Sequence, residues 1–271
     1  MKLNRSSGIS VASEFQASTR APQRSSGGTK ARAVSDVTPG AEISDDRHAR
    51  WLAACGVAGP VMLALYFGVP ALVPRLGSLT YSGGTPTTAK IVTVGAQYHQ
   101  LLTVGCWLQG TGALLCVVFL LALAQWSGGG SSFPGRILVL GCALLVGLVL
   151  AEMVFTFTWA SAASHGQSGT ARAAYDLMAR FAQVFPIVPA PTVYLALAAV
   201  LAAGRSILPP VFTRLAVAIG IGFLIVGLAV ALSPAAAAAA AAGGLAALQA
   251  LWILAAGITA LRVTNATPAA G

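Results

Sequence analysis

The chain has 271 residues, of which 56% are hydrophobic and only 8% are charged, and its formal net charge is +9. Soluble domains carry roughly 25% charged residues, so a compact water-soluble fold of this length would lack the polar surface to cover its core. The basic residues beyond position 50 are single and scattered, which excludes the clustered basic patch of a nucleic-acid-binding protein. The body of the chain therefore has a lipid bilayer as its expected surroundings.

The first 50 residues differ in composition from the rest. They hold eight of the sixteen basic residues and five of the seven acidic ones, and they are rich in Ser, Gly, Arg and Thr. A segment without apolar periodicity buries too little surface to offset its ordering entropy, so residues 1–50 are predicted to be a disordered, basic, cytoplasmic tail. Contact with a protein partner is expected through this tail.

Six apolar stretches follow the tail. A bilayer core takes about 20 residues of α-helix, and a helix satisfies its backbone polar groups within the segment. The predicted spans are 51–73, 99–126, 137–159, 181–203, 215–232 and 245–261, followed by a short C-terminal tail over 263–271. We therefore expect an all-α fold, a polytopic transmembrane helical bundle of about six spans that occupies residues 51–262.

Prolines mark irregular points in the first and fourth spans. Kinks are predicted at Pro60, Pro70, Pro186, Pro189 and Pro191. Before the fourth span, Ser168 is predicted to cap an amphipathic helix at the membrane interface. The alanine run 235–242 is predicted to be either a helical lead-in to the sixth span or an outer loop.

The distribution of Lys and Arg predicts that both termini face the cytoplasm. With the N-terminus inside, the inner side holds eight basic residues of the tail plus Arg136, Arg205, Arg214 and Arg262, and the outer side holds Arg75, Lys90, Arg172 and Arg180. Twelve against four favours the N-in, C-in arrangement, although without the tail the two sides are equal. Thirteen Arg against three Lys indicate a GC-rich coding genome. We expect a multi-pass protein of a bacterial cytoplasmic (inner) membrane.

Glu152 is the only acidic residue inside any predicted span. A carboxylate at membrane depth costs at least about 2.5 kcal/mol, and such residues commonly face the bundle interior and act in function. At 1.5 Å per residue, Glu152 lies roughly 10 Å below the outer end of its span, with Thr156 one turn above it.

Gln109 lies at a similar depth in the second span, roughly 15 Å below His99 at the outer end. We therefore expect Gln109 and Glu152 to meet, with His99 nearer the mouth and Thr156 beside them, as a proton or ligand site. A protonated Glu152 bonded to Gln109 would satisfy both groups without a buried charge. The alternative is that the pair only joins two helices.

Small residues line other helix faces. Gly105 and Gly112 lie on the face of Gln109, and the fifth span carries Gly220, Gly222 and Gly227. Small residues let helices approach closely in lipid, so these faces are predicted to pack against neighbouring helices. The four cysteines have no metal-binding spacing and are predicted to pack as small apolar groups.

No phosphate-binding loop or nucleophile motif is present, and no cofactor is expected. The leading hypothesis is a non-enzymatic small-solute or proton-coupled carrier, or an accessory membrane subunit. The first alternative is an intramembrane enzyme that holds a metal at the outer face with His99, Glu152 and His165, a ligand set suited to divalent ions. The second alternative is a structural or scaffolding membrane protein.

Overall fold

The computed structural model describes residues 39–72, 86–204, 207–232 and 236–266. The described residues form α-helices joined by turns, without a β-strand. The helices are α1 (Pro39–Leu72), α3 (Thr88–Gln97), α4 (His99–Trp126), α5 (Phe133–Ser164), α6 (Ser168–Val184), α7 (Pro189–Ala203), α8 (Pro210–Leu232) and α9 (Ala236–Ala266).

Six helical segments of the described residues are long and apolar enough to cross a membrane. They are Arg47–Gly68, His99–Trp126, Phe133–Ser164, Ser168–Ala203, Pro210–Leu232 and Ala240–Asn265. Each contains most or all of one predicted span, and the fourth combines α6 with α7. The predicted fold class, an all-α polytopic bundle, is confirmed.

The boundaries differ from the prediction at two places. α1 begins at Pro39, so residues 39–50, which the composition assigned to the tail, are helical. α9 begins at Ala236, so the part of the alanine run that it includes is a helical lead-in to the sixth span and not a loop. Residues 1–38, with most of the predicted tail, lie outside the described residues, as do Arg75 and Arg205.

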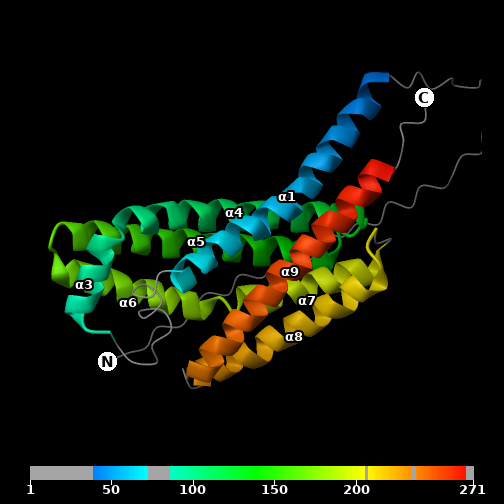
Figure 1. The fold of residues 1–271 in the computed structure, drawn as a ribbon. Coiled ribbons are helices and arrows are strands. Elements are labelled where there is room, and N and C mark those ends of the chain that lie inside the picture. The colour runs from blue at the N-terminus through cyan, green and yellow to red at the C-terminus, as the bar shows by residue number, and fades with distance from the viewer. Residues whose placement is uncertain (1–38, 73–85, 205–206, 233–235, 267–271) are drawn as a thin grey trace, which may run out of the picture. The chain divides into compact units, whose positions relative to one another are not determined.

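The spanning helices form a closed ring in chain order. α1 packs against α4, α4 against α5, α5 against α7, α7 against α8, α8 against α9, and α9 against α1. Figure 1 shows α4 and α5 side by side, with α1 and α9 inclined to them. Each helix therefore buries its faces mainly against its neighbours in the sequence, and α1 and α9, the first and last described helices, close the ring.

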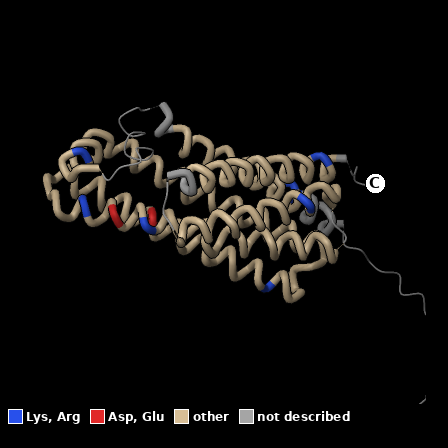
Figure 2. Tube along the Cα trace, turned by 90° about the horizontal axis from the view of Figure 1, so that it is seen from below, with Lys and Arg blue, Asp and Glu red and all other residues tan. Residues whose placement is uncertain are grey.

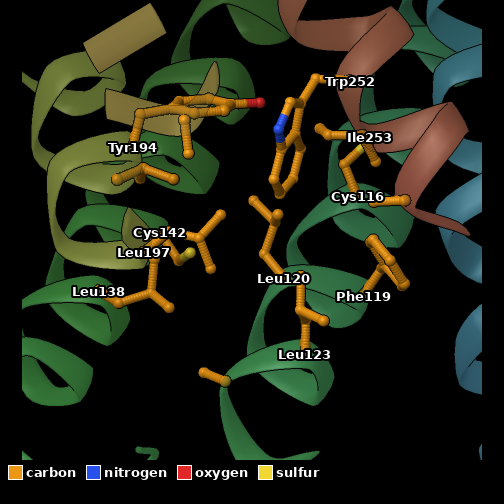
Figure 3. Packing of buried hydrophobic residues seen from close by; sticks show 14 of the residues in the cluster. Cys116, Phe119, Leu120, Leu123, Leu138, Cys142, Tyr194, Leu197, Trp252 and Ile253 are labelled. Carbon is orange, nitrogen blue, oxygen red and sulfur yellow. The ribbon is translucent and has the colours of Figure 1, made fainter. Parts of the chain in front are cut away.

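Side chains fill the inside of the ring. Tyr194 of α7 and Trp252 of α9 are 1% and 4% exposed, and their ring centroids lie 5.8 Å apart at 80°, edge to face. Figure 3 shows both directed toward the space beside Leu120 of α4. The indole Nε1 of Trp252 donates to the Phe212 carbonyl at 3.0 Å, which ties α9 to α8. The core at this level is a packed interior with aromatic pairs.

Glycines sit where neighbouring helices approach most closely. A Cβ on Gly112 of α4 would lie 3.0 Å from the Gly59 carbonyl of α1, and one on Gly257 of α9 would lie 2.6 Å from the Gly56 backbone of α1. The other glycines assigned to packing faces from the sequence also meet a neighbour: Gly105 meets Tyr66, Gly220 meets Leu195, Gly222 meets Leu245, and Gly227 meets Pro186 and Ile187. Close approach at small residues such as these glycines is how helices associate in lipid.

The prolines act differently in the two spans where kinks are predicted. α1 runs through Pro60 and Pro70 without ending. In the fourth span, α6 ends at Val184 and α7 begins at Pro189, so Pro186 lies in a break over residues 185–188. Proline is favoured at the first helical position because its missing N–H needs no partner there, which explains why α7 begins at Pro189.

A second cluster of buried residues lies at the α3 and α6 end of α5. Its members are Ile91, Val94, Trp159, Ala162, Ala163, Ala171, Ala174 and Tyr175. The indole Nε1 of Trp159 donates to the Ile91 carbonyl at 3.1 Å, and Arg172 donates to the Pro86 carbonyl at 2.7 Å. The predicted cap at Ser168 is wrong: Ser168 is the first helical residue of α6, and the N-cap is Gln167, which forms no side-chain cap bond.

The charged side chains mark the two ends of the bundle. Figure 2 shows most Lys and Arg near the two ends, with a basic and an acidic position side by side part-way along the bundle. The described basic residues at one set of helix ends are Arg47, Arg50, Arg136, Arg214 and Arg262, and those toward the other are Lys90 and Arg172. Arg180 lies further into the fourth span, in the last turns of α6. An even number of spans places the start of α1 and the end of α9 on the same side.

The N-in, C-in arrangement predicts where reporter proteins will work. A green fluorescent protein fused after Gly271 should fluoresce, since it folds in the cytoplasm, and alkaline phosphatase inserted at Gly166 should be active, since that turn lies outside. The measurement is whole-cell fluorescence and phosphatase activity for each fusion. Active phosphatase at the C-terminus would reverse the orientation.

The Gly257–Gly56 crossing predicts a specific loss of stability. Gly257→Ala places a methyl group against backbone that cannot turn aside, so overpacking should lower the free energy of unfolding by about 1–3 kcal/mol. The matched control is Gly147→Ala in α5, because a Cβ there meets nothing within 4 Å. Thermal unfolding in detergent measures both variants. Equal midpoints for the two variants would contradict the close approach of α1 and α9.

Candidate functional site

A short turn sets the register between α4 and α5. Gly128 has a φ of +72°, a conformation that glycine adopts without strain, and the Ser132 side chain caps α5 by accepting from the Gly135 N–H at 3.2 Å. Gln109 lies 18 residues before Ser127, and Glu152 lies 20 residues after Ser132. At 1.5 Å per residue these are roughly 27 and 30 Å from the turn, so the two side chains come level.

The structure brings Gln109 and Glu152 into direct contact. The Gln109 Nε2 donates to Glu152 Oε2 at 2.9 Å. Gln109 is 5% exposed, and Glu152, on the same face of α5 as buried Thr156, is partly exposed. The depths read from the sequence predicted this contact. Whether it binds a proton or a ligand is a separate question.

One oxygen of the pair has no partner. Gln109 Oε1 is buried and accepts no hydrogen bond from the described residues. Leaving a buried acceptor unpaired costs about 1–3 kcal/mol, so native structures rarely keep such a group without a reason. A hydrogen-bond donor to Gln109 Oε1 would remove this cost, and the hydroxyl of a protonated carboxyl group is one such donor.

Thr156 and Cys106 flank the pair without touching the carboxylate. The Thr156 hydroxyl donates to the Glu152 backbone carbonyl at 2.9 Å, one turn back in α5. The Cys106 thiol lies 4.0 Å from the Met153 carbonyl. Thr156 therefore lies beside the pair, as predicted, and its hydroxyl proton is used by the backbone.

No described basic residue forms an ion pair with Glu152. Among the described residues, Arg172 and Asp176 on α6 form an ion pair, with 2.7 Å between Arg172 Nε and Asp176 Oδ2. α4 contains no Lys or Arg, and the basic residue of α5 is Arg136, sixteen residues or roughly 24 Å from Glu152. An ionised Glu152 would therefore be an uncompensated charge inside the bundle.

The break in the fourth span lies close to the level of the pair. Phe155 of α5 stacks on Phe181 of α6 with ring centroids 5.1 Å apart, and a Cβ on Gly141 would lie 3.0 Å from Val193 of α7. Glu152 falls between these two levels, near the end of α6. The Gln109–Glu152 pair and the break over residues 185–188 therefore lie at similar depth, on different sides of α5.

The metal site proposed from His99, Glu152 and His165 is not formed. Glu152 lies in α5 and His165 caps its C-terminus, thirteen residues or roughly 20 Å away. His165 is exposed, with its Nδ1 at 2.8 Å from the Ser161 carbonyl. His99 lines an open pocket of about 490 Å³ at the α3–α4 junction, roughly 15 Å from the level of Gln109. No group of three His, Cys, Asp or Glu in the described chain could hold a metal ion.

Two buried polar groups were missed by the sequence analysis. The Tyr194 hydroxyl and Gln249 Oε1 also lack a hydrogen-bond partner among the described residues. A tyrosine in the fourth span and a glutamine in the sixth are visible in the sequence, but apolar flanks hide which face each one presents. Neither lies beside an acid, so neither has the chemistry of the Gln109–Glu152 pair.

The fold and the pair together define a multi-pass α-helical membrane protein with one carboxyl group held between two of its spans. Comparison with protein families, with curated proteins and with solved structures found no match.

The pair predicts opposite effects for two substitutions. Gln109→Leu removes the donor to Glu152 and should lower the free energy of unfolding by about 1–3 kcal/mol. Glu152→Gln keeps an acceptor for Gln109 Nε2 and adds an N–H that can reach Gln109 Oε1, so its stability should equal or exceed that of the wild type.

Thr158→Val is the control, because the Thr158 hydroxyl is exposed and bonds only one turn back to Val154. Such a surface change stays within about 0.5 kcal/mol. Thermal and denaturant unfolding in detergent measure all three variants. A Gln109→Leu variant as stable as Thr158→Val would mean that the contact contributes nothing.

Proposed function

We propose that this protein is a non-enzymatic carrier of the cytoplasmic membrane, for a small solute or coupled to protons, and that Gln109 and Glu152 form its proton site. The observation that carries the proposal is the 2.9 Å bond between Gln109 Nε2 and Glu152 Oε2, next to a buried amide oxygen without a donor. An intramembrane carboxyl group is costly to insert, which makes it by default a candidate functional site.

The pair has two chemical states that differ by one proton. When Glu152 is protonated, its hydroxyl can donate to Gln109 Oε1 while Gln109 Nε2 donates to the other carboxyl oxygen, so every polar atom is satisfied and the charge is zero. When Glu152 is ionised, Gln109 Oε1 loses its donor and a negative charge stands without a partner. The site thus couples one proton to one hydrogen bond between α4 and α5.

The surroundings support a carrier more than a helix joint. Discontinuous helices with Gly or Pro interruptions are typical of transporter binding sites at membrane depth. The break over residues 185–188 lies near the level of Glu152, and Gly227 of α8 packs against Pro186 and Ile187 within it. A polar pair that served only to join α4 and α5 would need neither the break nor an unpaired oxygen.

Glu152→Gln should abolish proton binding without loss of fold. At a pH where exposed carboxyl groups are already ionised, the wild-type protein in detergent should still show the infrared carbonyl band of a protonated carboxylic acid. This band should disappear as the pH rises further, and the variant should lack it. In proteoliposomes, solute-driven proton uptake should disappear with it. The measurement is infrared difference spectroscopy across a pH titration.

Asp176→Asn is the matched control, since it makes the same acid-to-amide change on α6 at a residue that pairs with Arg172 outside the α4–α5 contact. It should leave the titrating band in place. A wild-type protein without a titrating carboxylic acid, or a band that survives in the Glu152→Gln variant, would defeat the proposal.

A further inference from the structure

We infer that the Gln109–Glu152 pair binds a monovalent cation in competition with the proton. The inference rests on the proposed function, because it takes the same pair to be a ligand site and names the class of its ligand. It is drawn from the hydrogen-bonding groups at the pair and from the charge that surrounds them.

The groups left unused at the pair are oxygens. Gln109 Nε2 already donates to Glu152, and the Thr156 hydroxyl proton is used by the Glu152 backbone carbonyl. Thr156 also forms a side-chain hydrogen bond with Cys106. What remains is the buried Gln109 Oε1 and the carboxylate. Oxygen acceptors without donors suit an alkali cation or a protonated amine, and they offer nothing to an anion.

The charge count selects a single positive charge. With one ionised carboxylate and no basic partner, a monovalent cation leaves the pair neutral at membrane depth, a divalent ion leaves +1 and an anion leaves −2. Net charge in the bilayer interior is costly, so the neutral combination is favoured. The described residues also lack the cluster of acids or histidines that a divalent ion would need.

The helices packed against α5 bring few titratable groups to this level. α4 presents Cys106, and α7 contains no charged residue. α6 carries Arg172, Asp176 and Arg180, of which the first two pair with each other, and α3 carries Lys90. Lys90, Arg172 and Asp176 lie on α3 and α6 beside the second cluster. Arg180 is next to Phe181 and so lies about one turn from the level of Glu152, but its side chain is exposed and forms no ion pair with Glu152. The charge of the pair itself therefore decides which ligand it takes.

Competition between the cation and the proton predicts a measurable shift in the titration midpoint of Glu152. The full-length protein in detergent is titrated with pH while the carboxylic-acid infrared band is recorded, first in choline chloride and then with NaCl, KCl or methylammonium chloride in its place at constant ionic strength. One cation displaces one proton, so the titration midpoint should fall by about one pH unit for each tenfold rise in cation concentration above its dissociation constant. The sodium, potassium and methylammonium arms separate an inorganic ion from an amine.

The controls separate this inference from the proposed function. Sodium gluconate should give the same shift as NaCl, and Gln109→Leu, which keeps the carboxyl but loses the free amide oxygen, should need at least about ten times more cation for the same shift. A band that titrates with the same midpoint in all four cations would overturn the inference and leave the proton site standing. A band that never titrates would overturn the proposed function.

Discussion

In lipid no water is present to satisfy a polar group, so every such group in the spans depends on what the protein itself supplies. Backbone groups are satisfied by the helices, and small residues such as Gly112 and Gly257 then let those helices touch. Side chains with polar atoms must find partners across the same contacts. The Gln109–Glu152 bond is the case in which the partner is another span and in which one of the two groups can change its charge.

The same constraint explains which features the sequence could reveal. Hydropathy averaged over a span tolerates single exceptions, so six spans are predictable although α1 begins at Pro39 and α6 joins α7 across a break. The Gln109–Glu152 contact was predictable because a helix has a fixed rise and residues 127–132 leave little freedom in register. The depth of each residue along its helix, together with the presence of one acid in the predicted spans, was enough to predict the contact.

Features that depend on rotation and on distant contacts were not predictable in this way. The buried hydroxyl of Tyr194 and the closing contact between α1 and α9 are examples. A span that is apolar on all sides carries little record of which side faces a neighbour. The failed metal set shows the same limit, because residues assigned to one side of a membrane need not lie at one depth.

The two helix contacts of α4 near the pair differ in how easily they can repack, and this difference bears on the effect that binding a proton at Glu152 would have. α1 and α4 meet backbone to backbone at Gly59 and Gly112, where neither can shift without moving a helix. α4 and α5 meet at the level of the pair through Gly110 and the Met153 thioether, which is flexible and can repack. The contact that contains the proposed proton site is thus the softer of the two, so a change in charge there would act where the ring can adjust to it.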